Sequence, residues 1–151
     1  MQFVSREAAK SNKIIRRSVL ERDIEQIVKL VIDTGLNVHI DVGPGLLESV
    51  YEAVLAKRLE HLGLKVDRQM PIKISIDGMI FPDAFRADII VERKLLIELK
   101  SIDHLMPVHS KQVLTYLRLA NLSIGLLMNF GEDTFKQGLK RLVNNHTGKI
   151  V

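Results

Sequence analysis

Residues 85–100 read FRADIIVERKLLIELK, and this stretch decides the fold. It contains two runs rich in aliphatic side chains, 85–91 and 95–100, separated by three polar residues. Short aliphatic runs bounded by polar residues are typical of strands, and the polar segment 92–94 is long enough for a hairpin loop. The stretch therefore predicts two antiparallel strands joined by a loop.

The length of that loop sets which side chains meet across the hairpin. With a three-residue loop, Asp88 lies directly opposite Glu98, and strand alternation places Lys100 on the same face. A two-residue loop would instead set Asp88 opposite Ile97 and would disperse the three charged groups. If the loop has three residues, we expect two carboxylates and an ammonium group to converge, with ~5 Å between Cβ atoms.

The flanking sequence predicts helices around a sheet. Apolar residues recur at helical spacing before and after the hairpin, with breaks at Gly43-Pro44-Gly45, Gly63 and Asn121, and Asp77-Gly78 is a hairpin-turn signal. In chain order the pattern predicts helices over 24–43 and 46–62, strands over 66–76, 85–91 and 95–100, a helix over 107–120, a strand over 124–130 and a helix over 135–143. This order predicts an α/β fold with a mixed four-stranded sheet packed between helices.

Composition limits the kind of protein further. The 151 residues suit one domain, 46% of them are hydrophobic, and no apolar run approaches the ~18 residues of a membrane-spanning helix. The N-terminus lacks the apolar stretch of a secretory signal, so we expect a cytoplasmic protein without membrane association. Because the chain has no cysteine, a disulfide scaffold, a thiol nucleophile, a cysteine zinc site and an iron–sulfur cluster are excluded.

The net charge of +4 lies in the N-terminal segment. Residues 1–22 contain six basic and two acidic residues, whereas the rest of the chain carries equal numbers of each. Such an arm suits a nucleic-acid backbone, because Lys and Arg displace its counterions. A solvated tail and a mitochondrial presequence are the alternatives. We therefore divide the chain into a basic extension, 1–20, and a domain, 21–151.

Asp88 and Glu98 would repel each other if both were ionised at the distance that the hairpin imposes. A divalent cation relieves the repulsion, and Mg²⁺ binds oxygen ligands, commonly one or two carboxylates together with a substrate phosphate. The backbone carbonyl of Leu99 would complete a suitable partial ligand set. Lys100 would orient or help deprotonate the attacking water, or stabilise charge on the phosphate. The alternative is a salt bridge among the three charged side chains on a solvent-facing strand.

Two further positions carry polar groups that could join this site. Glu48 precedes Tyr51 by three residues and so begins the apolar stripe expected to face the core; alternatively, it is an acid favoured in the first turn of a helix. Gln112 and Tyr116 are four residues apart on one predicted helix, so an amide and a phenol should share a face. That pair could also form an ordinary half-buried rim of the helix.

Together, these residues resemble a known family. Residues 45–52, GLLESVYE, match the GxxExxY signature. Asp88, Glu98-Leu99-Lys100 and the Gln112/Tyr116 pair follow in the order found in GxxExxY proteins, a branch of the PD-(D/E)XK nuclease superfamily. The resemblance implies a restriction-endonuclease-like α/β core with a mixed four-stranded sheet.

The resemblance extends to Gln69 and Asn129 and implies roles for the site residues. It implies Asp88 and Glu98 as metal ligands and Lys100 as the catalytic lysine. It also implies Glu48 as an additional catalytic acid at the metal or its water. Gln112 and Tyr116 would arrange the site and the nucleic acid.

These roles predict a Mg²⁺-dependent nuclease acting on DNA, with Mn²⁺ able to replace Mg²⁺. The 5% aromatic content offers little surface for stacking single-stranded bases, which favours contact with duplex or backbone. The main alternative is a module of nuclease fold that binds nucleic acid or another phosphate ligand without cleaving it. A purely structural subunit would leave Glu48 unexplained.

Overall fold

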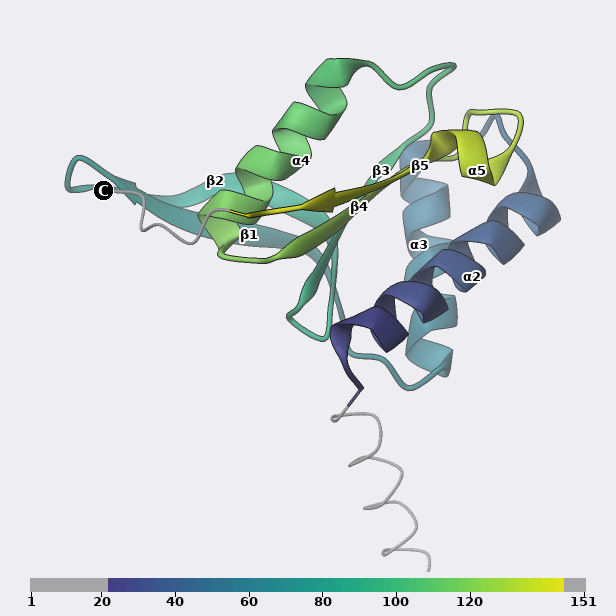
Figure 1. The fold of residues 1–151 in the computed structure, drawn as a ribbon, viewed down its shortest axis with the longest axis horizontal. Coiled ribbons are helices and arrows are strands. Elements are labelled where there is room, and N and C mark those ends of the chain that lie inside the picture. The colour runs from purple at the N-terminus through teal and green to yellow at the C-terminus, as the bar shows by residue number, and fades with distance from the viewer. Residues whose placement is uncertain (1–21, 146–151) are drawn as a thin grey trace, which may run out of the picture.

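The computed structural model describes residues 22–145 of the chain (Figure 1). Its elements, in chain order, are α2 (Ile24–Val42), α3 (Glu48–His61), β1 (Val66–Ile76), β2 (Met79–Val91), β3 (Leu95–Lys100), α4 (Pro107–Ala120), β4 (Ile124–Asn129), α5 (Phe135–Gly138) and β5 (Leu139–Val143). The basic extension predicted over 1–20 lies outside the described residues.

The strands form one mixed sheet in the order β1-β2-β3-β4-β5. β3 and β4 are parallel, with α4 as the crossover between them, and the other neighbouring pairs are antiparallel. The α/β fold and the mixed sheet are confirmed. The sheet has five strands rather than the predicted four.

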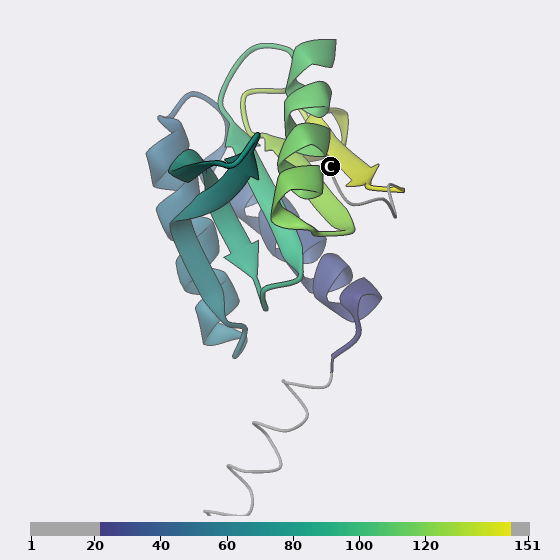
Figure 2. The ribbon, with the colours of Figure 1, turned by 90° about the vertical axis from the view of Figure 1, so that its left-hand side faces the viewer.

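Helices cover both faces of the sheet, so the fold has three layers (Figures 1 and 2). α2 and α3 pack with α5 on one face, against strand residues that include Ile89 and Ile97. α4 covers the other face, where Val113 and Leu117 pack against Leu96. The outer half of the β1–β2 hairpin extends beyond these layers (Figure 1).

The first hairpin turns at Asp77-Gly78, as predicted. Both residues have positive φ, 51° and 76°, the backbone conformation that matches a two-residue turn to the twist of its strands. Ile76 pairs with Met79 directly beside the turn. Because β2 pairs with β1 from this point, β2 begins at Met79 and not near residue 85, where the sequence pattern placed its start.

The second hairpin sets the register of the central strands. Its loop has three residues, 92–94, and Ile89 pairs with Ile97 while Val91 pairs with Leu95. This is the register predicted from a three-residue loop, and its continuation sets residue 88 opposite residue 98. The two-residue alternative is therefore wrong.

The C-terminal segment corrects the prediction of a helix over 135–143. Only the single turn α5 is helical, and Leu139–Val143 forms β5, antiparallel to β4. The spacing of apolar residues in this segment fits both a helix and a strand. The strand forms because its hydrogen bonds with β4 satisfy the backbone groups along one side of that buried strand. Gly138 allows this path, since a Cβ there would approach the Asn129 carbonyl oxygen to 2.1 Å.

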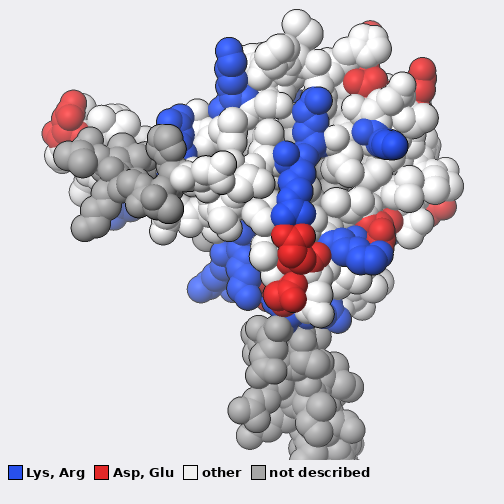
Figure 3. Space-filling view, in the orientation of Figure 1, with Lys and Arg blue, Asp and Glu red and all other residues white. Residues whose placement is uncertain are grey.

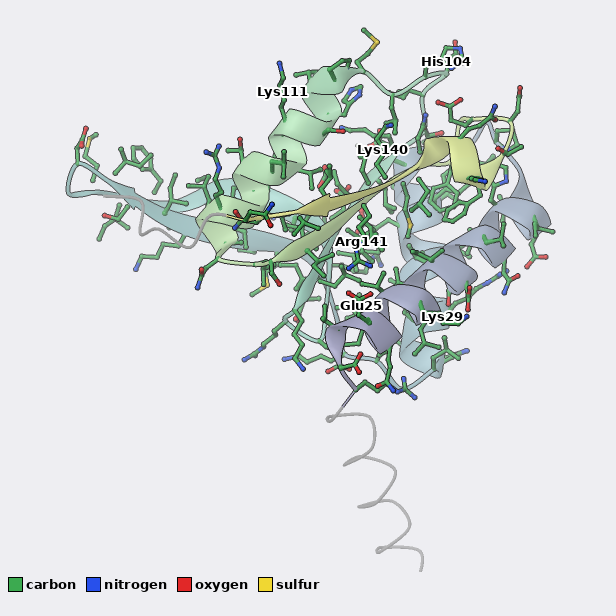
Figure 4. The ribbon with its side chains drawn as sticks, viewed as in Figure 1. Glu25, Lys29, His104, Lys111, Lys140 and Arg141 are labelled. Carbon is green, nitrogen blue, oxygen red and sulfur yellow. The ribbon has the colours of Figure 1, made fainter. Side chains whose placement is uncertain are left out.

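An ion pair joins β5 to the first helix of the described chain. Arg141 donates from both terminal nitrogens to the Glu25 carboxylate, and Nη1 lies 2.9 Å from Oε2 (Figure 4). The face of the molecule seen in Figure 3 also carries several basic side chains. Two of them, Lys111 in α4 and Lys140 in β5, are labelled in Figure 4.

Candidate active site

β2 and β3 separate at the point where the charged residues begin. The paired part of the ladder ends at Ile89 and Ile97, and the next hydrogen-bonded pair would join Ala87 to Leu99. Instead, the Leu99 N–H donates to Asp88 Oδ2 at 2.8 Å. The Asp88 carboxylate thus takes the place of a ladder carbonyl at the opening between the two strands.

Glu98 is buried beside this opening. Its relative exposure is 7%, and its Oε2 has no hydrogen-bond partner. The pKa of Glu98 is raised to about 8, mainly by burial and then by the negative charge of Asp88; a hydrogen bond with Asp88 and the charge of Glu48 add to the rise, and the charge of Lys100 opposes it. A buried carboxyl group in this setting needs a proton or a cation.

Lys100 ends β3 and is partly exposed. Its positive charge lowers the pKa of Glu98, so the two groups lie within electrostatic reach. Among the ion pairs of residues 22–145, none joins Lys100 to Asp88 or Glu98. Since Glu98 is also buried, the solvent-facing salt bridge considered above is not what the structure contains.

The backbone of Leu99 completes the inner part of the site. A strand residue directs its N–H and its C=O to the same neighbouring strand. Because the Leu99 N–H meets Asp88, its carbonyl oxygen is directed toward the same opening. The carbonyl that the sequence analysis predicted as a metal ligand therefore belongs to the edge of β3 that meets Asp88.

Glu48 is the first residue of α3 and is exposed, so the prediction that it belongs to the core-facing stripe is wrong. The stripe begins one turn later, at the fully buried Tyr51. Glu48 nevertheless lies near enough to raise the pKa of Glu98. It therefore contributes negative charge from the solvent side of the site.

Tyr51 holds the loop that leads into α3. Its hydroxyl donates to the Gly43 carbonyl at 2.6 Å and accepts the Leu46 N–H at 3.1 Å. Its ring stacks on Phe130, with centroids 4.6 Å apart and planes 6° from parallel. Tyr51 thus anchors the segment before Glu48 through the packing of its ring in the core and through its two hydrogen bonds.

Gln112 and Tyr116 share one face of α4, as predicted from their spacing. Gln112 Nε2 donates to the Tyr116 hydroxyl at 2.7 Å, and the Tyr116 ring stacks on Phe85 of β2, with centroids 4.0 Å apart. Burial raises the pKa of Tyr116, and the negative charge of Glu98 adds to the rise. The phenol therefore lies within electrostatic reach of the carboxylate pair.

Residues without an assigned role in the sequence interpretation also support the site. Glu52, only 6% exposed, accepts Gln69 Nε2 at 2.8 Å, and the same nitrogen donates to Asp88 Oδ1 at 3.1 Å. The buried Asn129 donates to the Ile102 carbonyl at 2.8 Å and holds the loop after β3. The sequence feature that could have indicated a role for Glu52 is its position directly after Tyr51, a residue of the apolar stripe of α3.

A cleft of about 500 Å³ opens beside Asp88. It lies between the start of α3 and the sheet, and it is lined by Leu46, Leu47, Glu48, Ser49, Glu52, Gln69, Asp88 and Ser101. Three carboxylates therefore face one cleft that is large enough for a small ligand group.

The donor set fits a hard divalent cation. Within residues 22–145 no group of three or more His, Asp or Glu side chains is arranged to hold a metal ion by itself. Asp88 and Glu98 offer two carboxylates beside the Leu99 carbonyl, and the free Oε2 of Glu98 is an oxygen without a protein partner. Mg²⁺ commonly binds through one or two carboxylates and keeps several waters.

These features define an α/β protein with two carboxylates and a lysine at the opening of a mixed sheet. A family model for the PD-(D/E)XK nuclease superfamily matches residues 25–142, so the chain belongs to this superfamily. Membership indicates a nuclease-type function and a nucleic-acid substrate, and these nucleases generally use divalent metals such as Mg²⁺.

Two further comparisons, with curated proteins and with solved structures, gave no match. Over the described part of the chain, no helix combines the length and apolar character that crossing a membrane requires.

Proposed function

We propose that this protein is a Mg²⁺-dependent nuclease that hydrolyses phosphodiester bonds of DNA. The observation that carries the proposal is the buried Glu98 carboxyl group, whose Oε2 lacks a hydrogen-bond partner while Asp88 and Glu48 place further negative charge nearby. A protein keeps such a group at a cost in stability, which is typical of functional sites. A bound cation would remove that cost.

In this proposal Asp88, Glu98 and the Leu99 carbonyl hold the ion. When bound, a divalent ion supplies positive charge at the scissile phosphate and lowers the pKa of a bound water. Lys100 would orient the attacking water or stabilise charge that develops on the phosphate oxygens. The superfamily membership supports this assignment of residues.

Three further side chains would act around the phosphate. Glu48, exposed at the start of α3, would accept a hydrogen bond from water at the ion. Gln112 and Tyr116 would contact the nucleic acid from α4, and the stack on Phe85 limits the motion of the Tyr116 ring.

The GxxExxY signature over 45–52 and the order of the other motifs support placing the chain in the GxxExxY branch.

The rival function is binding of nucleic acid without cleavage. An intact set of Asp88, Glu98 and Lys100 favours hydrolysis, because a binding surface would not need a buried glutamate next to a second carboxylate and a lysine. The two functions make different predictions only for turnover, so an activity measurement decides between them.

The test is a cleavage assay on supercoiled plasmid, linear duplex DNA, single-stranded DNA and RNA, with Mg²⁺, with Mn²⁺ and with chelator. Glu98→Gln, purified in the same way, is the control for a contaminating nuclease. We expect metal-dependent cleavage of DNA by the wild type and none by the variant. Binding without turnover on all four substrates would favour the rival function.

A further inference from the structure

The Asp88 carboxylate is held at both of its oxygens. Oδ2 accepts the Leu99 N–H at 2.8 Å, and Oδ1 accepts the side-chain amide of Gln69 at 3.1 Å. The same Gln69 nitrogen donates to Glu52 Oε2 at 2.8 Å. A chain of hydrogen bonds therefore runs from Glu52 in α3 through Gln69 in β1 to Asp88 in β2.

Glu52 decides which end of the Gln69 amide faces Asp88. Its side chain is 8% exposed, and its other oxygen accepts Arg68 Nε at 3.1 Å. An ionised carboxylate only accepts hydrogen bonds, so the NH₂ group of Gln69 must point toward it. Since one NH₂ group carries two hydrogens, the second is directed at Asp88, whereas a reversed amide would set oxygen against oxygen.

The backbone of Gln69 is distorted to make these contacts. Its φ is +49°, a left-handed conformation that a residue other than glycine seldom adopts within a strand. Arg68 pairs with Ile89 and Met70 with Ala87, which would set a regular residue 69 opposite Asp88. Strained backbone of this kind persists where surrounding contacts hold it and often marks a functional site.

We infer that Glu52 and Gln69 are positioning residues that hold the Asp88 carboxylate in the orientation needed to bind a divalent cation together with Glu98. The inference rests on the proposed metal site. The partners of metal-binding carboxylates commonly set metal affinity, and their replacement typically weakens it 10–100-fold. The competing interpretation is structural: Glu52 would only anchor α3 to β1 through Arg68.

Gln69→Gly separates the two interpretations. Glycine adopts a φ near +49° without steric cost, so the variant loses the amide while its backbone strain is relieved. In chelator we expect only a small change in melting temperature, because relief of the strain offsets the loss of the hydrogen bond to the buried Glu52 carboxylate. The dissociation constant for Mg²⁺, from calorimetry or from the metal-dependent rise in melting temperature, should increase about 10–100-fold.

Two matched controls accompany it. Asp77→Gly relieves the same kind of positive φ, +51°, in the hairpin turn that follows β1, and should leave the Mg²⁺ dissociation constant unchanged. Arg68→Ala removes the ion pair with Glu52 and leaves the amide of Gln69 in place. It should change melting in chelator more than it changes metal affinity.

Glu52→Gln completes the set, because it keeps the size of the side chain while allowing the Gln69 amide to reverse. We expect it to weaken Mg²⁺ binding, and the double variant Glu52→Gln/Gln69→Gly should bind no more weakly than Gln69→Gly alone, since both changes break one chain of contacts. Normal Mg²⁺ affinity in Gln69→Gly, beside a wild type that binds Mg²⁺, would overturn the positioning role and leave the metal site standing. A wild type without any response to Mg²⁺ or Mn²⁺ would overturn both proposals.

Discussion

The Leu99 N–H donates to the Asp88 side chain at 2.8 Å, at the position where β3 would otherwise bond to the backbone of β2. The two strands of the central hairpin therefore separate at Asp88. On the neighbouring strand, Glu98 is the first residue after the last pair, Ile89 with Ile97. Because Glu98 is buried, solvent screens the negative charge of Asp88 less than it would between two surface groups, and that charge raises the pKa of Glu98. The pKa of Glu98 consequently depends on the charge at position 88.

Asp88→Asn should lower the pKa of Glu98 from its value of about 8, because it removes a negative charge and a hydrogen-bond acceptor that favour the protonated form. The pKa should stay above the ordinary 4.5, since burial is the largest cause of the shift. Carbon-13 NMR of the Glu98 carboxyl group as a function of pH measures it. An unchanged midpoint would mean that the two carboxyl groups are not coupled.

Glu98→Gln should make the metal-free protein more stable at alkaline pH. With a folded-state pKa of about 8 against 4.5 when unfolded, native Glu98 retains a proton that the unfolded chain releases. Its contribution to stability is complete below the lower value and is lost as the pH rises through the higher one. At ~1.4 kcal/mol per pKa unit, the loss is on the order of a few kcal/mol.

Glutamine does not titrate, so the variant should escape this loss. Urea unfolding in chelator across the pH range checks it: the two proteins should unfold alike in acid, and the variant should be the more stable in alkali. Mg²⁺ should raise the melting temperature of the wild type and not that of the variant. If Glu98 were instead part of a structural ion pair, the variant would be destabilised and neither protein would respond to metal.

Lys100→Ala should separate metal binding from turnover. The lysine is partly exposed and makes no ion pair with Asp88 or Glu98 among the described contacts, so its loss should leave the fold and the Mg²⁺-dependent rise in melting temperature in place. Cleavage should fall by about 100-fold or more, the range for loss of a group that stabilises the transition state. Parallel melting and cleavage measurements decide it, and retained cleavage would exclude a catalytic role.

Gly131→Ala should destabilise the protein by about 1–3 kcal/mol or more. A Cβ at this position would lie 2.1 Å from the Ile102 carbonyl oxygen, and backbone must move to admit it. Gly125→Ala is the milder control, because its nearest atoms are ends of side chains, such as Val113 Cγ1 at 3.0 Å. Equal losses in the two variants, measured by urea unfolding, would contradict the rigid packing of the loop after β3.

Removal of residues 1–21 should weaken nucleic-acid binding and reduce its dependence on salt, because this segment holds most of the excess of basic residues. The Mg²⁺-dependent rise in melting temperature should be unchanged, since Asp88 and Glu98 lie within the described residues. Fluorescence anisotropy at several salt concentrations, in chelator, measures the effect. Equal salt dependence in both proteins would make the arm a solvated tail.

The sequence by itself determined the central hairpin and the faces of its strands. Three polar residues at 92–94 and the alternation of side chains along a strand are local properties, and they suffice to predict the register that pairs Ile89 with Ile97. The i, i+4 spacing of Gln112 and Tyr116 likewise predicted their shared face on α4. Local spacing is reliable where one regular element, or one short loop, carries both residues.

Tertiary structure decided the features that depend on distant segments. Leu139–Val143 became a strand because β4 had a side to pair with, although its apolar spacing also fits a helix. Glu48 is exposed because α3 begins at the surface, directly after the loop that Tyr51 holds. The positive φ of Gln69 and the raised pKa of Glu98 arise from contacts between residues far apart in the chain, so the spacing of residues in the sequence could not predict them.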